Sequence, residues 1–294
     1  MENKFKKEWE AIENEDTQPR WYRKVLELPY DEFRRDVLAQ NPMQVKSMVD
    51  SLYAGDVLIL KNAFPVDYLR QLRKTMHDFG KKSESSFHKM VDGCPDFSRK
   101  ITPELAKNYA LRQIKHSFYF FPWNADRFNL FGPIYQRWGV FKFLSGYAFD
   151  AYEKNIPSKG VVDRLQIVNY PSGVGELEVH SDPYLYQKTT ISCIMSKIGE
   201  DFETGGTYVV SENQERVNLE DRFEVGDIYI LYPTVLHGVE TIDDGYRVDW
   251  DSIRGRWFMG FYSNASDEYA RRHTVYGVEN MLKEGAFAVK NKVE

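Results

Sequence analysis

Two histidines and one aspartate have a spacing that suits metal binding. His180 and Asp182 are separated by one residue and follow the extended segment LEV. Because positions i and i+2 of a strand face the same way, this imidazole and this carboxylate can converge on one ion. His237 follows the apolar segment DIYILYP and can add a second imidazole from a neighbouring strand. The three residues predict a metal site that leaves several coordination positions open.

The same residues also have structural interpretations. A His-x-Asp pattern arises by chance in many proteins. His180 could end a strand, Asp182 could begin a turn before Pro183, and His237 could be an ordinary strand residue. Two His and one carboxylate are nevertheless the ligand set of non-haem Fe(II) oxygenases. The surrounding elements therefore decide between these interpretations.

Short apolar segments alternate with turn residues from position 161 to 263. The turns contain PSGVG, ETGG, EVGD and DDG, and many short strands with regular turns are typical of a β-sandwich or barrel. The predicted strands are Leu165–Tyr170, Leu177–His180, Thr189–Ser196, Thr207–Val210, Asp227–Tyr232, His237–Thr241 and Arg256–Ser263.

The N-terminal half is predicted to be mostly helical. Apolar periodicity and terminal residues indicate helices at 1–17, 31–39, 43–53, 65–80 and 130–153, with one buried strand at 56–64. Residues 81–105 are polar and irregular and predict a mobile loop, of which 81–100 could close as a lid. The pattern predicts one domain over 1–294: helical support in 1–160, a β-core in 161–264 and a terminal helix in 265–294.

Composition excludes several classes of function. The chain has 294 residues, 42% of them apolar and 28% charged, as in ordinary globular proteins. Its net charge of −5 and lack of a basic tract argue against a nucleic-acid partner. No apolar run approaches the roughly 18 residues of a membrane span, and the charged N-terminus does not resemble a signal peptide. Cys94 and Cys193 form no disulfide framework, which favours a cytoplasmic location.

Residues 164–263 resemble the double-stranded β-helix core of the Fe(II)/2-oxoglutarate-dependent oxygenases, especially the prolyl-hydroxylase and phytanoyl-type branches. The resemblance implies a jelly-roll, cupin-like fold that is mainly β with flanking helices. It implies that His180, Asp182 and His237 bind Fe(II), that 2-oxoglutarate and O2 are co-substrates, and that ascorbate stimulates turnover. The matching stretches are LQIVNYPSGVGELEVHSD, ISCIMSKI, ETGGTYVV, FEVGDIYILYPTVLHGVE and RGRWFMGFYSN, with DVLILKNAFPVDYLRQLR before them.

The family places a basic residue after the distal His to bind the far carboxylate of 2-oxoglutarate. An Arg suits this role because its planar fork makes two parallel bonds to a carboxylate. Arg256 is the preferred candidate, with Arg254 and Arg247 as alternatives, because the segment after His237 contains an inserted loop. Tyr170 and Ser196 lie where relatives place co-substrate contacts. The alternatives are surface charges for the arginines, a core tyrosine and an ordinary strand serine.

The resemblance implies hydroxylation of an unactivated C–H bond, coupled to decarboxylation of 2-oxoglutarate to succinate. Related halogenases replace the carboxylate with a small residue, so Asp182 favours hydroxylation, while desaturation and cyclisation stay open. We expect a small polar metabolite, such as an amino acid or a biosynthetic intermediate, with Tyr184, Tyr186 and Arg164 as candidate contacts. The alternatives are a protein side-chain hydroxylase, a cupin-type enzyme that does not use 2-oxoglutarate, and an inactive binding barrel. The sequence leaves the oligomeric state open.

Overall fold

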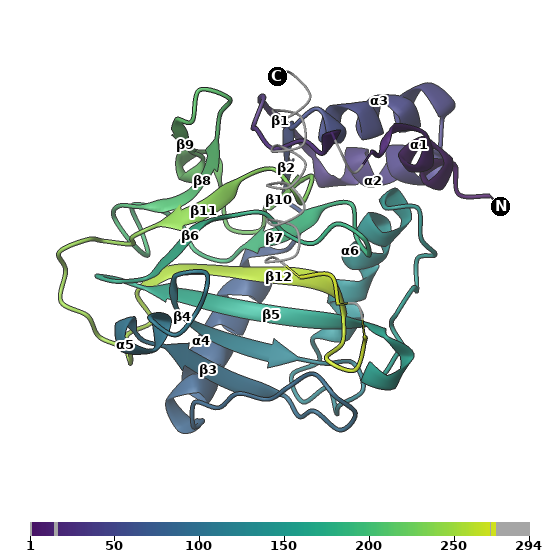
Figure 1. Ribbon diagram of the computed structural model, residues 1–294. Helices are drawn as coiled ribbons and strands as arrows, with labels where there is room; N and C mark the ends of the chain where they lie inside the picture. Colours follow the sequence, from purple (N-terminus) through teal and green to yellow (C-terminus); the bar gives the residue numbers. More distant parts are fainter. Residues whose placement is uncertain (1, 15–16, 271, 275–294) are drawn as a thin grey trace, which may run out of the picture.

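The computed structural model describes residues 2–14, 17–270 and 272–274 (Figure 1). Its centre consists of two antiparallel four-stranded sheets, and the chain passes back and forth between them. The first sheet has the order β10-β7-β12-β5, and the second has the order β6-β11-β8-β9. This topology is that of a double-stranded β-helix, as the sequence predicts. The bounds are β5 Val161–Pro171, β6 Glu176–His180, β7 Thr190–Ile194, β8 Gly206–Val210, β9 Arg216–Asn218, β10 Ile228–Leu231, β11 His237–Glu240 and β12 Gly255–Ala265.

The described N-terminal half contains the six helices α1–α6, in keeping with the prediction, and also four strands, of which only β2 was predicted. β2 pairs with β10 and β1 pairs with β2 at one edge, while β4 pairs with β5 and β3 with β4 at the other. β4 carries Lys115 and His116 among buried residues. These polar residues interrupt the apolar pattern from which a buried strand is predicted in a sequence. The bounds are β1 Val25–Pro29, β2 Val57–Lys61, β3 Phe97–Ile101 and β4 Gln113–Phe120.

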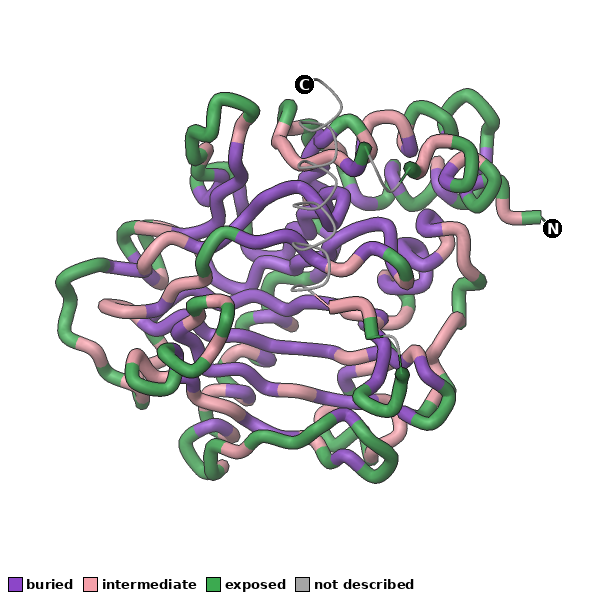
Figure 2. The backbone as a smooth tube through the Cα atoms, viewed as in Figure 1, coloured by how far each residue is buried: buried purple, intermediate pink, exposed green. Residues whose placement is uncertain are grey.

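Helices cover the outer face of the first sheet (Figure 1). Phe79 of α4 lies against Phe118 of β4, and Trp138 of α6 stacks on Phe261 of β12 with ring centroids 5.4 Å apart. One hydrophobic core therefore includes helices of the N-terminal half and strands of the jelly roll. Figure 2 shows the buried residues in purple. The bounds are α1 Lys4–Ile12, α2 Tyr30–Ala39, α3 Pro42–Tyr53, α4 Val66–Lys82, α5 Pro103–Ala106 and α6 Phe131–Leu144, with 3-10 turns Pro157–Lys159 and Glu220–Arg222.

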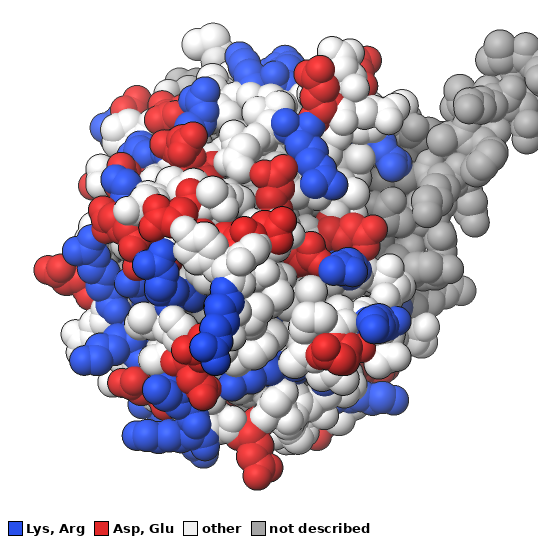
Figure 3. Space-filling view, turned by 90° about the vertical axis from the view of Figure 1, so that its left-hand side faces the viewer, with Lys and Arg blue, Asp and Glu red and all other residues white. Residues whose placement is uncertain are grey.

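Two other predictions about the chain need revision. The segment predicted as one irregular loop, 81–105, contains β3 and the start of α5. Ala265, the first residue of the predicted terminal helix, belongs to β12, and residues 275–294 lie outside the described residues. No helix in the described part of the chain is long and apolar enough to cross a membrane. The face in Figure 3 carries Lys and Arg side chains interspersed with Asp and Glu.

A buried ion pair joins α6 to the jelly roll. Lys142 Nζ lies 2.6 Å from Asp163 Oδ2, and the two side chains are 3% and 0% exposed. Removing one partner of such a pair costs about 3–5 kcal/mol because the other charge stays buried without compensation. We expect Lys142→Met to lower the free energy of unfolding by that amount in urea denaturation. Lys46→Met, which breaks an exposed pair with Asp50, is the control. Equal stabilities of the two variants would contradict this account of the pair.

Candidate metal and co-substrate site

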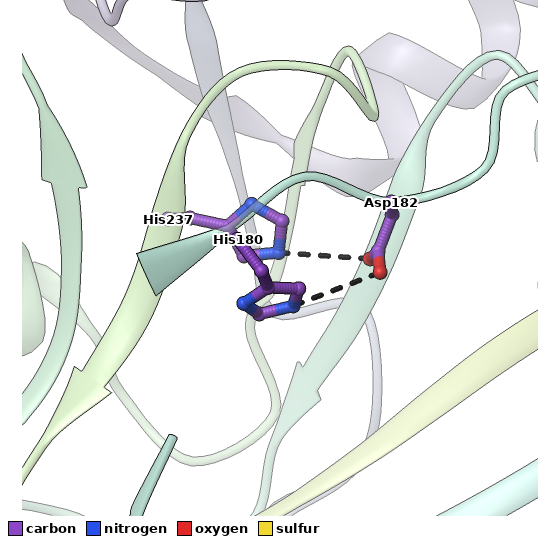
Figure 4. A group of neighbouring side chains, drawn as sticks. All are labelled: His180, Asp182 and His237. Carbon is purple, nitrogen blue, oxygen red and sulfur yellow. Dashed lines mark ion pairs between the residues drawn. The ribbon is translucent and has the colours of Figure 1, made fainter. Parts of the chain in front are cut away.

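His180, Asp182 and His237 come together between β6 and β11 (Figure 4). The two histidines are directly paired across these antiparallel strands, and Asp182 follows two residues after β6. The Nε2 atoms of His180 and His237 each lie 3.6 Å from an oxygen of Asp182. Donors bound about 2.1 Å from one ion lie roughly 3.0–3.5 Å apart. The three side chains therefore fit a single metal ion between them.

Backbone carbonyls orient both imidazoles. His180 Nδ1 lies 2.9 Å from the carbonyl of Glu178, and His237 Nδ1 lies 2.8 Å from the carbonyl of Val235. Because a carbonyl oxygen can only accept, each Nδ1 carries a hydrogen, so each Nε2 is the nitrogen left to bind a metal. Metal-binding histidines typically have such a partner on the second nitrogen. Both Nε2 atoms face Asp182. Burial lowers the pKa of His237, but Asp182 outweighs it and raises this pKa, so a metal here competes with a proton on His237.

The local electrostatics give the aspartate and His180 the protonation states that a metal requires. Burial favours protonation of Asp182, but His237 and His180 outweigh it and hold the pKa of this carboxyl well below its usual value. Burial, assisted by His237, lowers the pKa of His180 to about 4. At neutral pH, Asp182 is therefore an anion and His180 a neutral imidazole. Metal ligands need these forms, because a proton on the ligand atom competes with the ion.

Thr190 of β7 holds the carboxylate in place. Its hydroxyl donates to Asp182 Oδ2 over 3.2 Å. Loss of such a partner typically weakens metal binding 10- to 100-fold, because the ligand is no longer oriented. We expect Thr190→Val to weaken Mn(II) binding about 10-fold in a titration followed by electron paramagnetic resonance. Thr189→Val is the matched control, since the buried hydroxyl of Thr189 has no partner in the described structure. The same affinity in both variants would contradict the role of Thr190.

The three residues line a cavity of about 270 Å³ between the two sheets, and Arg256 lies in the same cavity. Arg256 is the first residue of β12 whose side chain lines the cavity, and it is 1% exposed. Its Nε donates to Glu220 Oε2 over 2.9 Å, and its Nη2 donates to Thr207 Oγ1. These contacts fix the plane of the guanidinium. Within the described part of the chain, Nη1 is the terminal nitrogen left for a further partner.

Tyr170 lies beside Arg256 and carries a hydroxyl without a partner. The two residues are paired across β5 and β12, and both line the cavity. The Tyr170 hydroxyl is fully buried and forms no hydrogen bond in the described structure. Burial raises its pKa far above the ordinary value, so the phenol keeps its hydrogen at neutral pH. An unpartnered buried donor costs free energy, and a carboxylate held by Arg256 Nη1 would satisfy this one. These residues fit the far end of a 2-oxoglutarate molecule.

The other residues predicted to bind the co-substrate do not line this cavity in the described structure. Arg254 is half-exposed and pairs with Glu203, and Arg247 is exposed in the loop after β11. Ser196 bonds the backbone of Trp257, accepting from its N–H over 2.7 Å, and thus fixes β7 to β12. Arg254 and Arg256 are two positions apart and would share a face within one strand. Because β12 begins at Gly255, Arg254 lies before the strand and does not share that face.

Of the three candidate substrate contacts, one lines the described cavity and two do not. Arg164 of β5 lines the cavity. Tyr184 instead packs against Tyr232, and Tyr186 lies against Tyr269, both outside the cavity in the described structure. The segment after Asp182 leaves the cavity, which the sequence position alone did not reveal.

Sequence reasoning missed Glu220, Thr207 and Lys115. The first two contact Arg256 from the turn after β9 and from β8, and nothing in the local sequence marks these partners. Lys115 is a buried cation in a strand. That combination is a signal for a site, but it appears only once β4 is recognised as a strand.

Comparison with known proteins finds likenesses in structure alone. No protein-family model matches the chain, and no curated protein matches it. Similar solved structures include a full-length Neurospora crassa protein in complex with alpha-KG and thymine, at 14% identity and a TM-score of 0.49, covering 94% of this chain and 99% of the other. A putative 2OG-Fe(II) oxygenase family protein from Caulobacter crescentus has 12% identity and a TM-score of 0.47, covering 88% and 99%.

A Pseudomonas putida prolyl-4-hydroxylase has 11% identity and a TM-score of 0.44, covering 74% of this chain and 97% of the other. These are likenesses of fold. The chemistry proposed below rests on the side chains of this chain.

Proposed function

We propose that the protein is an Fe(II)- and 2-oxoglutarate-dependent oxygenase that hydroxylates an unactivated C–H bond of a small polar molecule. The observation that carries this proposal is the arrangement of His180, Asp182 and His237 as three convergent ligands in a cavity. Two imidazoles and one carboxylate leave coordination positions open for a co-substrate and oxygen. When bound, the metal with its co-substrate supplies the oxidising power, and succinate and carbon dioxide are the co-products.

The side chains of this chain have three tasks in that reaction. His180, Asp182 and His237 hold the metal, with Thr190 orienting the carboxylate. Arg256 and Tyr170 bind the far carboxylate of 2-oxoglutarate, which orients the molecule in the cavity. The walls exclude water, since each metal ligand is less than 10% exposed. Positioning and exclusion of side reactions are what a protein contributes to such chemistry.

Two features favour hydroxylation of a small molecule. Asp182 fills the ligand position that a halide would need, which supports hydroxylation over halogenation. The ligands line a cavity of about 270 Å³, just below the roughly 300–1,000 Å³ of typical small-molecule sites, which favours a small substrate. A protein side chain would have to reach this cavity from a flexible segment.

Cys94 and Cys193 are free and buried, in keeping with a cytoplasmic location.

Turnover of 2-oxoglutarate tests this proposal without knowledge of the substrate. We expect the wild-type protein to form succinate in air with Fe(II) and ascorbate, and a mixture of metabolites to stimulate this reaction. His180→Ala should form none, because one metal ligand is missing. Succinate formation that does not require Fe(II), or that continues in His180→Ala, would contradict the proposal. So would complete absence of turnover with and without the metabolite mixture.

A further inference from the structure

Two cations besides Arg256 line the cavity. Arg164 and Lys115 both line the cavity, on β5 and β4 respectively. Along the β5–β12 ladder Arg256 is paired with Tyr170, whereas Arg164 is paired with Tyr262, six residues further along β12. At about 3.3 Å per residue, the backbones of the two arginines are far apart. One carboxylate of 2-oxoglutarate bound at Arg256 therefore does not account for Arg164.

Neither cation has an ion-pair partner in the described structure, although the charge of Asp182 acts on Lys115. Neither Lys115 nor Arg164 forms an ion pair with a carboxylate among the described residues, although Lys115 is only 8% exposed. The Arg164 Nε is buried without a hydrogen-bond partner. Burial, followed by the charge of Arg164, lowers the pKa of Lys115 to about 8, so the ammonium is still the main form at neutral pH. A buried charge without an ion-pair partner, here that of Lys115, is costly, which points to a missing anion.

Rings hold Arg164 in position from two sides. Its guanidinium carbon lies 4.9 Å from the ring centroid of Tyr262 and 5.7 Å from that of Tyr119. Such cation–π contacts fix the cation without neutralising its charge. The guanidinium is therefore held in the cavity wall with donor nitrogens available to a ligand.

The net charge of the cavity also requires one anion. Asp182 is the only acidic residue lining it in the described structure, and Glu220 balances Arg256. A divalent metal with Asp182 leaves one positive charge, and the two carboxylates of 2-oxoglutarate turn this into one negative charge. Lys115 and Arg164 then leave a single positive charge in the loaded cavity. One carboxylate on the second substrate would neutralise it.

We propose that Lys115 and Arg164 bind a carboxylate of the molecule that is oxidised, so that the substrate class is a small organic acid. This inference rests on the proposed function, since it places the substrate beside the metal and 2-oxoglutarate. A second cavity of about 160 Å³ shares Gln113, Tyr119 and Arg164 with the first. Its walls include Phe97 stacked on Tyr119, with ring centroids 4.5 Å apart. Its walls combine such rings with the charged side chains of Arg99, Asp267 and Arg272, and it offers space for the rest of the acid.

Acetate and its neutral analogue acetamide test this proposal directly. Wild-type protein is loaded with Mn(II) and saturating 2-oxoglutarate, and the relaxation rate of the probe's methyl protons is measured by NMR as the probe is titrated. The paramagnetic ion accelerates relaxation only for a molecule bound nearby. We expect a saturable acceleration for acetate that is at least about 10-fold larger than for acetamide. This comparison needs no variant.

Variants then locate the binding site. Lys115→Gln combined with Arg164→Gln should reduce the acetate effect at least about 10-fold while metal-dependent binding of 2-oxoglutarate is retained. Arg112→Gln is the matched control, because Arg112 precedes β4 on the exposed surface and pairs with Glu176. It should leave both binding events unchanged.

Three results would overturn the proposal. They are equal effects of acetate and acetamide in the wild type, an undiminished acetate effect in the double variant, and loss of 2-oxoglutarate binding in the double variant. The last would assign the two cations to the co-substrate. Failure of 2-oxoglutarate to bind to the wild-type protein with Mn(II) is a different outcome, because it would refute the proposed function itself.

Discussion

Replacing His237 with alanine should weaken Mn(II) binding by more than the roughly 100-fold that loss of an outer partner can cost. His237 supplies one of three ligand atoms that lie within 4.8 Å of one another. Without it, Asp182 and His180 remain as a two-ligand site in a buried cavity. The measurement is a titration of the protein with Mn(II), in which electron paramagnetic resonance reports the free ion. Succinate formation should be lost in parallel.

The control for this prediction is His77→Ala. His77 lies on α4, and its Nε2 is 2.9 Å from the backbone carbonyl of Asp251, so its imidazole is used in a loop contact. This variant should bind Mn(II) as the wild type does. If His237→Ala also bound Mn(II) with nearly wild-type affinity, the three residues would not form the metal site.

Replacing Arg256 with lysine should weaken 2-oxoglutarate binding about 10- to 100-fold and leave Mn(II) binding unchanged. A lysine ammonium can still balance the buried carboxylate of Glu220, which limits the loss of stability. It cannot reach Glu220, Thr207 and a ligand at once as the planar guanidinium does. A hydrogen bond between charged groups contributes about 1.5–3 kcal/mol, and each 1.4 kcal/mol is tenfold in affinity. Calorimetric titration with 2-oxoglutarate in the presence of Mn(II) measures the change.

Arg254→Lys is the matched control, since Arg254 is two residues away but half-exposed and paired with Glu203. It should bind 2-oxoglutarate as the wild type does. An equal effect of the two variants, or an effect of Arg254→Lys alone, would move the co-substrate site away from the cavity.

The sequence predicted that His180, Asp182 and His237 come together because their positions follow from strand geometry. His180 and Asp182 have the two-residue spacing of one strand face, and His237 begins the strand that pairs with β6. The preference for Arg256 over Arg254 and Arg247 likewise depended on where the last strand begins. That boundary is at Gly255, so of the three arginines Arg256 alone lines the described cavity.

The remaining parts of the site depend on contacts between distant segments. Glu220 reaches Arg256 from a turn that sequence analysis could not place against β12. Lys115 was missed because β4 was not recognised as a strand, since charged and polar residues interrupt its apolar pattern. Tyr184 and Tyr186 follow Asp182 closely, but the chain turns away after the metal ligands and packs these rings elsewhere.

The most direct test of the central claim is a calorimetric titration of the wild-type protein with 2-oxoglutarate, performed with and without Mn(II) in place of iron. The claim is that a metal at His180, Asp182 and His237 and a dicarboxylate at Arg256 share one cavity. It predicts one 2-oxoglutarate bound per chain with Mn(II), and binding at least about 10-fold weaker without it. Equal affinities in the two titrations, or no binding even with Mn(II), would contradict it.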